Sequence, residues 1–215
     1  IANIGGIANI TDLPVNGEVR GWDTGPGNML LDAWIRRHNG AHYDRDGAWA
    51  ASGTVQNTLL TELASHSYLT QPKSAGREQF NLAWLDATLN RLDQTLNPAD
   101  VQATLLEFTA TSLCDAVIRE CPGTQELYVC GGGAHNRTLM QRISAYLPNI
   151  KVATTSTLGI DPDWVEALAF AWLARQTLHH ATGNLPSVTG ARGERGRDEL
   201  LLGQRRLTRR FRPQR

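Results

Sequence analysis

The sequence contains few cysteines, and their arrangement excludes two common kinds of cysteine site. Cys114, Cys121 and Cys130 are the three cysteines in 215 residues. They are odd in number and are not spaced as zinc ligands, so we expect buried, reduced thiols in a cytoplasmic protein rather than disulfides. The six histidines form no ligand spacing with cysteines or carboxylates, and we predict no metal site made by protein ligands alone.

We also find no long apolar run in the sequence. No stretch approaches the roughly 20 apolar residues that a bilayer-spanning helix needs. The beginning of the chain shows no basic and apolar pattern of a secretory signal. With 41% hydrophobic and 20% charged residues, the composition is that of an ordinary globular protein, and we expect no membrane partner.

The formal net charge is zero, but charge is unevenly distributed along the chain. Residues 192–215 contain nine arginines and three acidic residues, so this tail carries a charge of +6 and the rest carries −6. An arginine-rich tail can bind nucleic acid. Because Phe211 is its one aromatic residue, we favour a solvated, disordered tail and rank nucleic-acid binding last.

The periodicity of apolar residues predicts an α/β domain with a mixed sheet. Two or three short strands are expected within residues 1–22, followed by a helix from residue 28 to Asn39 and several short helices between residues 43 and 97. A long helix is expected over residues 99–119. Further strands at 127–130 and 150–153 alternate with helices, and the last helix carries an apolar stripe.

The segment Gly21-Trp22-Asp23-Thr24-Gly25-Pro26-Gly27-Asn28 joins a predicted strand to a predicted helix. It places one carboxylate, Asp23, at the strand end and then a glycine turn whose exposed N–H groups could bind a phosphate or a sugar hydroxyl. Asp23 could then act as a general base. From the residues alone, a plain strand-to-helix turn is equally well supported.

A second glycine segment, Gly131-Gly132-Gly133-Ala134-His135-Asn136, follows the strand at 127–130. It matches neither the dinucleotide fingerprint nor the phosphate-binding P-loop. Three residues without a Cβ could let a ligand lie against the backbone, or they could serve a tight connection that needs positive φ. Glu166 lies in the first turn of the last helix, where a carboxylate favours the helix dipole.

Together these segments resemble the anhydro-N-acetylmuramic acid kinase family of the sugar kinase and actin-like ATPase superfamily. The resemblance runs nearly continuously from residue 1 to about 191. Its most specific part is Asp-Thr-Gly-Pro-Gly-Asn followed by Met-Leu-Leu-Asp-Ala-Trp. It is also carried by the segments 3–9, 21–32, 43–49, 72–80, 101–104, 130–136, 159–173 and 183–190.

The resemblance implies a ribonuclease-H-like domain over residues 1–191, with a mixed five-stranded sheet and a helical insertion at about 43–97. In this family it is the second of two domains that clamp ATP. An N-terminal half with a Gly-Thr-Ser-x-Asp-Gly phosphate loop is absent from this sequence, so we expect the chain alone to be inactive or nearly so.

The resemblance also implies the reaction and the site. ATP would phosphorylate O6 of 1,6-anhydro-N-acetylmuramic acid while water opens the anhydro ring, giving N-acetylmuramic acid 6-phosphate for cell-wall recycling. Asp23 would be the general base, Gly25 and Gly27 would lie near the phosphates, and Glu166 would contact the sugar. The adenosine pocket would be lined by Gly131, Gly132 and Gly133. Mg²⁺ would be held mainly by ATP oxygens and water.

A second hypothesis is a non-catalytic nucleotide-binding module of the same fold. The sequence leaves open whether the chain forms a homodimer.

Overall fold

Five strands form one mixed sheet in the computed structural model, which describes residues 1–66, 79–189 and 191–194. The strand order is β3-β2-β1-β4-β5. The strands are β1 (Ala2–Ile4), β2 (Ile7–Asp12), β3 (Arg20–Pro26), β4 (Glu126–Cys130) and β5 (Lys151–Thr154). β1, β2 and β3 pair antiparallel, whereas β4 pairs parallel with both β1 and β5. The predicted mixed sheet is confirmed.

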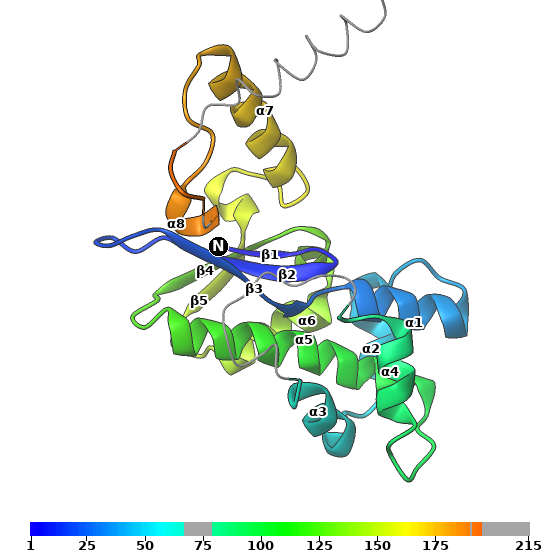
Figure 1. Ribbon diagram of the computed structural model, residues 1–215. Coiled ribbons are helices and arrows are strands. Elements are labelled where there is room, and N and C mark those ends of the chain that lie inside the picture. The colour runs from blue at the N-terminus through cyan, green and yellow to red at the C-terminus, as the bar shows by residue number, and fades with distance from the viewer. Residues whose placement is uncertain (67–78, 190, 195–215) are drawn as a thin grey trace, which may run out of the picture.

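Helices lie on both sides of this sheet (Figure 1). They are α1 (Met29–Asn39), α2 (Ala48–Ser52), α3 (Asn57–Ala64), α4 (Leu82–Leu89), α5 (Pro98–Glu120), α6 (Arg137–Tyr146), α7 (Val165–Leu178) and α8 (Pro186–Thr189). Short 3-10 turns occupy Arg45–Gly47, Gly132–His135 and Thr155–Leu158. Figure 1 shows α5 and α6 below the sheet, and α7 and α8 above it.

The hydrophobic core lies between α5 and one face of the sheet. Alternate residues of the first two strands, among them Ile4 and Ile10, are buried there together with Leu106 and Leu113 of α5. A period of two in the strands and of 3.6 in the helix turns both apolar faces inward. The Asn97 side chain caps the start of α5 by accepting a hydrogen bond from the Ala99 amide, and a proline follows it at the first helical position.

α5 corrects the expectation that no segment is long enough to span a bilayer. Among the described residues it is the one helix whose length and composition would allow a crossing, yet 78% of its apolar window is buried inside the fold. Such burial is what the central helix of a core shows. The predicted buried thiols are confirmed, since Cys114, Cys121 and Cys130 are all free and buried.

The segment between α1 and α5 contains short helices, as predicted for residues 43–97, although residues 67–78 lie outside the described part. The indole N–H of Trp34 in α1 donates to the Pro98 carbonyl at 2.9 Å and ties α1 to the start of α5. The arginine-rich tail predicted to be disordered lies outside the described residues from 195 onward.

Candidate active site

A row of polar side chains crosses the sheet on the face opposite α5. Asn3 of β1 is paired with Asn9 of β2, and Asn9 is paired with Asp23 of β3. Directly opposed residues of neighbouring strands point to the same face. The row therefore places Asn9 beside the carboxylate that the sequence singled out, with Asn3 on the next strand.

A β-bulge separates Asp23 from the buried end of β3. The register passes from Ala8–Gly25 to Asn9–Asp23, which leaves Thr24 as the extra residue. Thr24 is buried, and its hydroxyl lies 3.2 Å from the Ala8 carbonyl oxygen. Bulges re-aim neighbouring side chains and are frequent beside active sites, so this irregularity sets where the Asp23 carboxylate stands.

The sequence predicted exposed N–H groups in the glycine turn after Asp23, but the structure shows that the amides of residues 27–29 are hydrogen-bonded within the protein. Gly27 is buried, and its N–H donates to the Gly6 carbonyl at 2.9 Å. The next two amides are also engaged, since Asn28 donates to Gly5 at 2.8 Å and Met29 donates to Gly6 at 3.1 Å. The amides at the start of α1 therefore hold the β1–β2 turn and do not face outward.

Glycine is required in this turn for two separate reasons. Gly25 is buried and has φ of 138°, a backbone conformation that side chains with a Cβ rarely adopt. Gly27 has no room for a Cβ, which would overlap the Gly5 carbonyl oxygen. Thr109 of α5 supports the turn from below, because its hydroxyl lies within hydrogen-bond distance of the Pro26 and Gly27 carbonyls.

The triple-glycine segment packs against the same β1–β2 region. A Cβ on Gly131, whose φ is 77°, would overlap the Asn3 amide oxygen, and a Cβ on Gly133 would overlap Ile4. The Gly131 N–H donates to the Pro162 carbonyl at 3.2 Å. Gly131 and Gly133 therefore serve the tight connection that the sequence left open, and the exposed glycine of the three is Gly132.

Asn28 links the two glycine segments. Its side-chain amide donates to the Ile4 carbonyl at 3.1 Å, and a Cβ on Gly132 would stand 3.4 Å from that amide nitrogen. Sequence positions more than 100 residues apart thus meet at the end of β1. The structure brings both predicted glycine segments together on one edge of the sheet.

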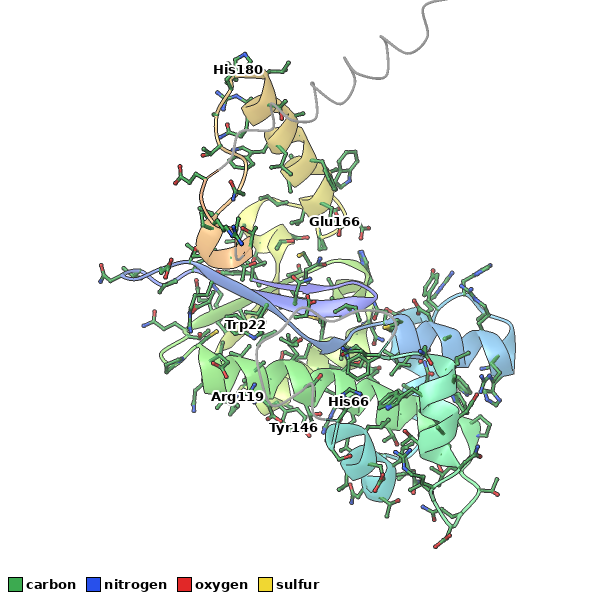
Figure 2. All side chains as sticks on the ribbon, viewed as in Figure 1. Trp22, His66, Arg119, Tyr146, Glu166 and His180 are labelled. Atoms are coloured by element: carbon green, nitrogen blue, oxygen red, sulfur yellow. The ribbon has the colours of Figure 1, made fainter. Side chains whose placement is uncertain are left out.

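Glu166 lies at the end of α7 nearer the sheet (Figure 2). Burial raises the pKa of the Cys130 thiol, and the nearby Glu166 carboxylate adds to that rise. Since Cys130 is paired with Asn3, Glu166 stands toward the Asn3 end of the polar row. His135 and Asp163 approach within 2.9 Å and connect the triple-glycine segment to the residues before α7.

A cavity of about 530 Å³ opens beside Gly132. Its walls come from the start of α1, the loop before α2 and the segment after β4. The lining residues are Asn28, Leu31, Asp32, Tyr43, Asp44, Arg45, Asp46, Gly132, His135 and Asn136. This volume lies within the usual range for small-molecule sites. A larger hollow of about 770 Å³ near the β2–β3 turn contains none of the predicted site residues.

The cavity contains an acidic group that sequence reasoning missed. Burial raises the pKa of Asp32 to about 6, although the neighbouring Arg36 pulls it the other way. Asp32 falls in the first turn of α1, where its carboxylate can accept hydrogen bonds from a ligand in the cavity. The available signal in the sequence was a single carboxylate directly after Met29-Leu30-Leu31, in an otherwise apolar first turn.

We expect Asp32→Asn to stabilise the chain at alkaline pH. The folded pKa of about 6 exceeds the ordinary value of 3.8, so ionising Asp32 costs folding free energy as pH rises through about 6. The variant should gain roughly 2–3 kcal/mol in unfolding free energy at pH 8. The gain should vanish below pH about 4, because Asp32 is then protonated in both the folded and the unfolded wild-type protein. Urea denaturation at both pH values measures it; a variant less stable at pH 8 would contradict the assignment.

Within the described ranges, no group of three or more His, Cys, Asp or Glu residues could hold a metal ion. The thiols are equally unsuited to nucleophilic chemistry, because burial raises the pKa of Cys114 to about 12 and that of Cys121 to about 11.

Comparison with known proteins identifies the family. The sequence model of the anhydro-N-acetylmuramic acid kinase family matches residues 1–201, ten residues beyond the resemblance noted from motifs. The chain is 72% identical over 197 residues to the protein of that name from Thiobacillus denitrificans, covering 91% of this chain and 53% of the relative. It is 55% identical over 196 residues to the one from Saccharophagus degradans, with 90% and 53% covered.

The chain thus spans about half the length of the curated relatives it matches. Because the match covers all of the described residues and includes both glycine segments, this chain belongs to the anhydro-N-acetylmuramic acid kinase family.

Proposed function

We propose that this chain supplies the catalytic base and the adenosine pocket of a kinase acting on 1,6-anhydro-N-acetylmuramic acid. The observation that carries the proposal is the row from Asn3 to Asp23, which ends beside the triple-glycine segment in a member of this family. The strand order β3-β2-β1-β4-β5 supports the ribonuclease-H-like, actin-like ATPase class, with the short helices between residues 43 and 97 as an insertion.

The chemistry needs one proton acceptor. Water attacks C1 of the sugar, the bond between C1 and O6 breaks, and O6 forms a bond to the γ-phosphorus of ATP as ADP leaves. One proton is released from the attacking water, and Asp23 takes it. The product is N-acetylmuramic acid 6-phosphate, which fits a cytoplasmic role in cell-wall recycling.

The cavity beside Gly132 suits the adenosine of ATP. Asn28, Asn136 and Asp32 offer polar groups at its wall, while Leu31 and Tyr43 offer apolar surface. Gly131 and Gly133 would shape this pocket from behind rather than touch the ligand. Gly25 and Gly27 would form the floor beneath the phosphates, and exposed Glu166 would contact the sugar from the foot of α7.

Positioning by a second polypeptide unit is part of the proposal. Phosphoryl transfer depends chiefly on clamping the phosphates and on electrostatic stabilisation. Mg²⁺ would be held mainly by ATP oxygens and water and would enter with ATP, and no step here depends on protein ligands to it. We define the complementary half as the part of the Thiobacillus denitrificans relative that this chain does not span.

The test is a kinase assay with and without the complementary half, added as a separate chain or fused ahead of residue 1. We expect sugar phosphate and ADP to form in equal amounts when both halves are present, and little or no product from this chain alone. Absence of product from the fused protein would refute the kinase proposal. Nucleotide binding without turnover would then favour the non-catalytic module, which the half-length match also allows.

A further inference from the structure

Helix α7 carries an apolar surface that nothing in the described structure covers. The eight residues Ala167–Ala174 between Glu166 and Arg175 contain no charged or polar side chain. Not one residue of α7 is buried. The large apolar side chains that form the α7 surface are Trp164, Leu168, Phe170, Trp172 and Leu178, which are 63%, 50%, 65%, 49% and 81% exposed.

Such a helix requires a partner on physical grounds. A helix that is apolar all round is normally buried, and an isolated helix of this length is marginal in water. Trp164, Leu168 and Trp172 follow one another at intervals of four residues along one face, while Phe170 faces another side. Several large apolar side chains exposed together on one helix mark an interaction site.

Among the described residues, the C-terminal part of α7 contacts the chain that follows it. The Gln176 side chain donates to the Thr182 carbonyl at 2.9 Å, and Leu173 is the neighbour that a Cβ on Gly183 would meet at 3.1 Å. These contacts fix the end of α7 near His180, which Figure 2 places far from the sheet. They leave the faces with Trp172 and Phe170 uncovered.

The position of α7 indicates what covers it. α7 stands on the side of the sheet opposite α5 (Figure 1), the side on which the row from Asn3 to Asp23 lies, and Glu166 is at its foot. A unit that packs on α7 from this side would also close over Asp23. The relatives match α7 and carry about as much polypeptide again outside the match.

We propose that the α7 surface is the docking site for the complementary half, which it holds over the polar row. This inference rests on the proposed function, because phosphoryl transfer needs a site closed to bulk water. A second copy of this chain paired through α7 would cover the apolar side chains but supply no phosphate-clamping unit above Asp23. The complementary half meets both needs.

The test measures association, independently of activity. This chain and the complementary half are mixed as separate polypeptides, and sedimentation velocity follows complex formation. We expect a one-to-one complex, weakened about a hundredfold or more by the double variant Phe170→Glu with Trp172→Glu, since buried aromatic side chains dominate interface energies. Both residues are exposed, so the variant should retain the circular dichroism and melting temperature of the unsubstituted chain.

Val15→Glu is the matched control, because Val15 is 99% exposed on the β2–β3 turn away from α7. It should leave the complex unchanged. An equally tight complex with the double variant would overturn the proposal, as would the absence of any complex. Self-association of this chain, lost in the double variant, would assign α7 to a homodimer instead. A tight complex that phosphorylates no sugar would refute the kinase proposal and leave the docking surface in place.

Discussion

Replacing Asp23 with Asn should reduce kcat of the fused two-half enzyme by about a hundredfold to ten-thousandfold, the usual contribution of a general base. The amide keeps the size of the side chain but cannot accept the proton that the attacking water releases. Because Asp23 is not expected to bind the nucleotide, the KM for ATP should change little. The measurement is steady-state formation of sugar phosphate over a range of ATP concentrations.

The control for this prediction is Asp115→Asn. Asp115 is an exposed residue of α5, the helix that covers the other face of the sheet. Its substitution removes the same charge without touching the polar row, and kcat should stay within a factor of about two. If Asp23→Asn kept most of the wild-type kcat, the proton would have to leave by another route and the role of Asp23 would be disproved.

Periodicity predicted the framework of this fold because it reports which faces are apolar. Residues 99–119 have the pattern of a core helix, and α5 confirms it with Leu106 and Leu113 buried against the sheet. The alternation of apolar residues likewise predicted the strands. The alternation Ala2-Asn3-Ile4 and Ala8-Asn9-Ile10 also contained the polar row, but only the pairing register shows that Asn9 stands beside Asp23 and that Asn3 follows it on the next strand.

The glycine segments show what local sequence cannot supply. The Gly27 N–H is not available to a ligand because it donates to the carbonyl of Gly6, which lies in the β1–β2 turn, 21 residues earlier in the chain. Likewise, Gly131 and Gly133 are explained by Asn3 and Ile4 of a neighbouring strand. The glycine patterns therefore singled out two segments that the structure brings together, while the role of each glycine could be explained only from tertiary contacts.

The last helix was interpreted as having an apolar stripe, and that stripe exists, but it does not face this chain's core. An apolar helix surface predicts that the surface is buried, but it does not show whether the same polypeptide or another one covers it. In α7 the apolar residues extend round the helix, with Phe170 and Trp172 on different sides. The sequence did contain a signal for this second interface, because the apolar residues of α7 cover a wider arc than a helix buried on one side needs.

Replacing Arg142 with Met should destabilise the fold by about 3 kcal/mol or more at pH 7. Arg142 of α6 donates two hydrogen bonds, of 2.8 and 2.6 Å, to the carboxylate of Glu107 in α5, and Glu107 is 4% exposed. Met preserves the packing of the side-chain stem. It leaves a buried carboxylate with the Tyr146 hydroxyl, 2.5 Å away, as its remaining partner, and an uncompensated buried charge is costly.

The pH dependence of this loss distinguishes charge from packing. Burial pushes the pKa of Glu107 upward, but hydrogen bonds from Arg142 and Tyr146 outweigh it and hold the pKa below its ordinary value. The stabilisation is therefore present above pH about 4.5 and is lost as pH falls through the folded pKa. The difference between wild type and Arg142→Met should shrink near pH 4, where the variant can protonate Glu107.

Arg37→Met is the matched control, because Arg37 also forms two hydrogen bonds to a carboxylate, at 2.5 and 3.0 Å, but its partner Asp86 is 43% exposed. That exposed pair should cost at most about 1 kcal/mol when broken. Adding Glu107→Gln to Arg142→Met should restore part of the lost stability, since it removes the unpaired charge. Equal losses in both arginine variants, measured by urea denaturation, would show that Glu107 is not held as a buried anion between α5 and α6.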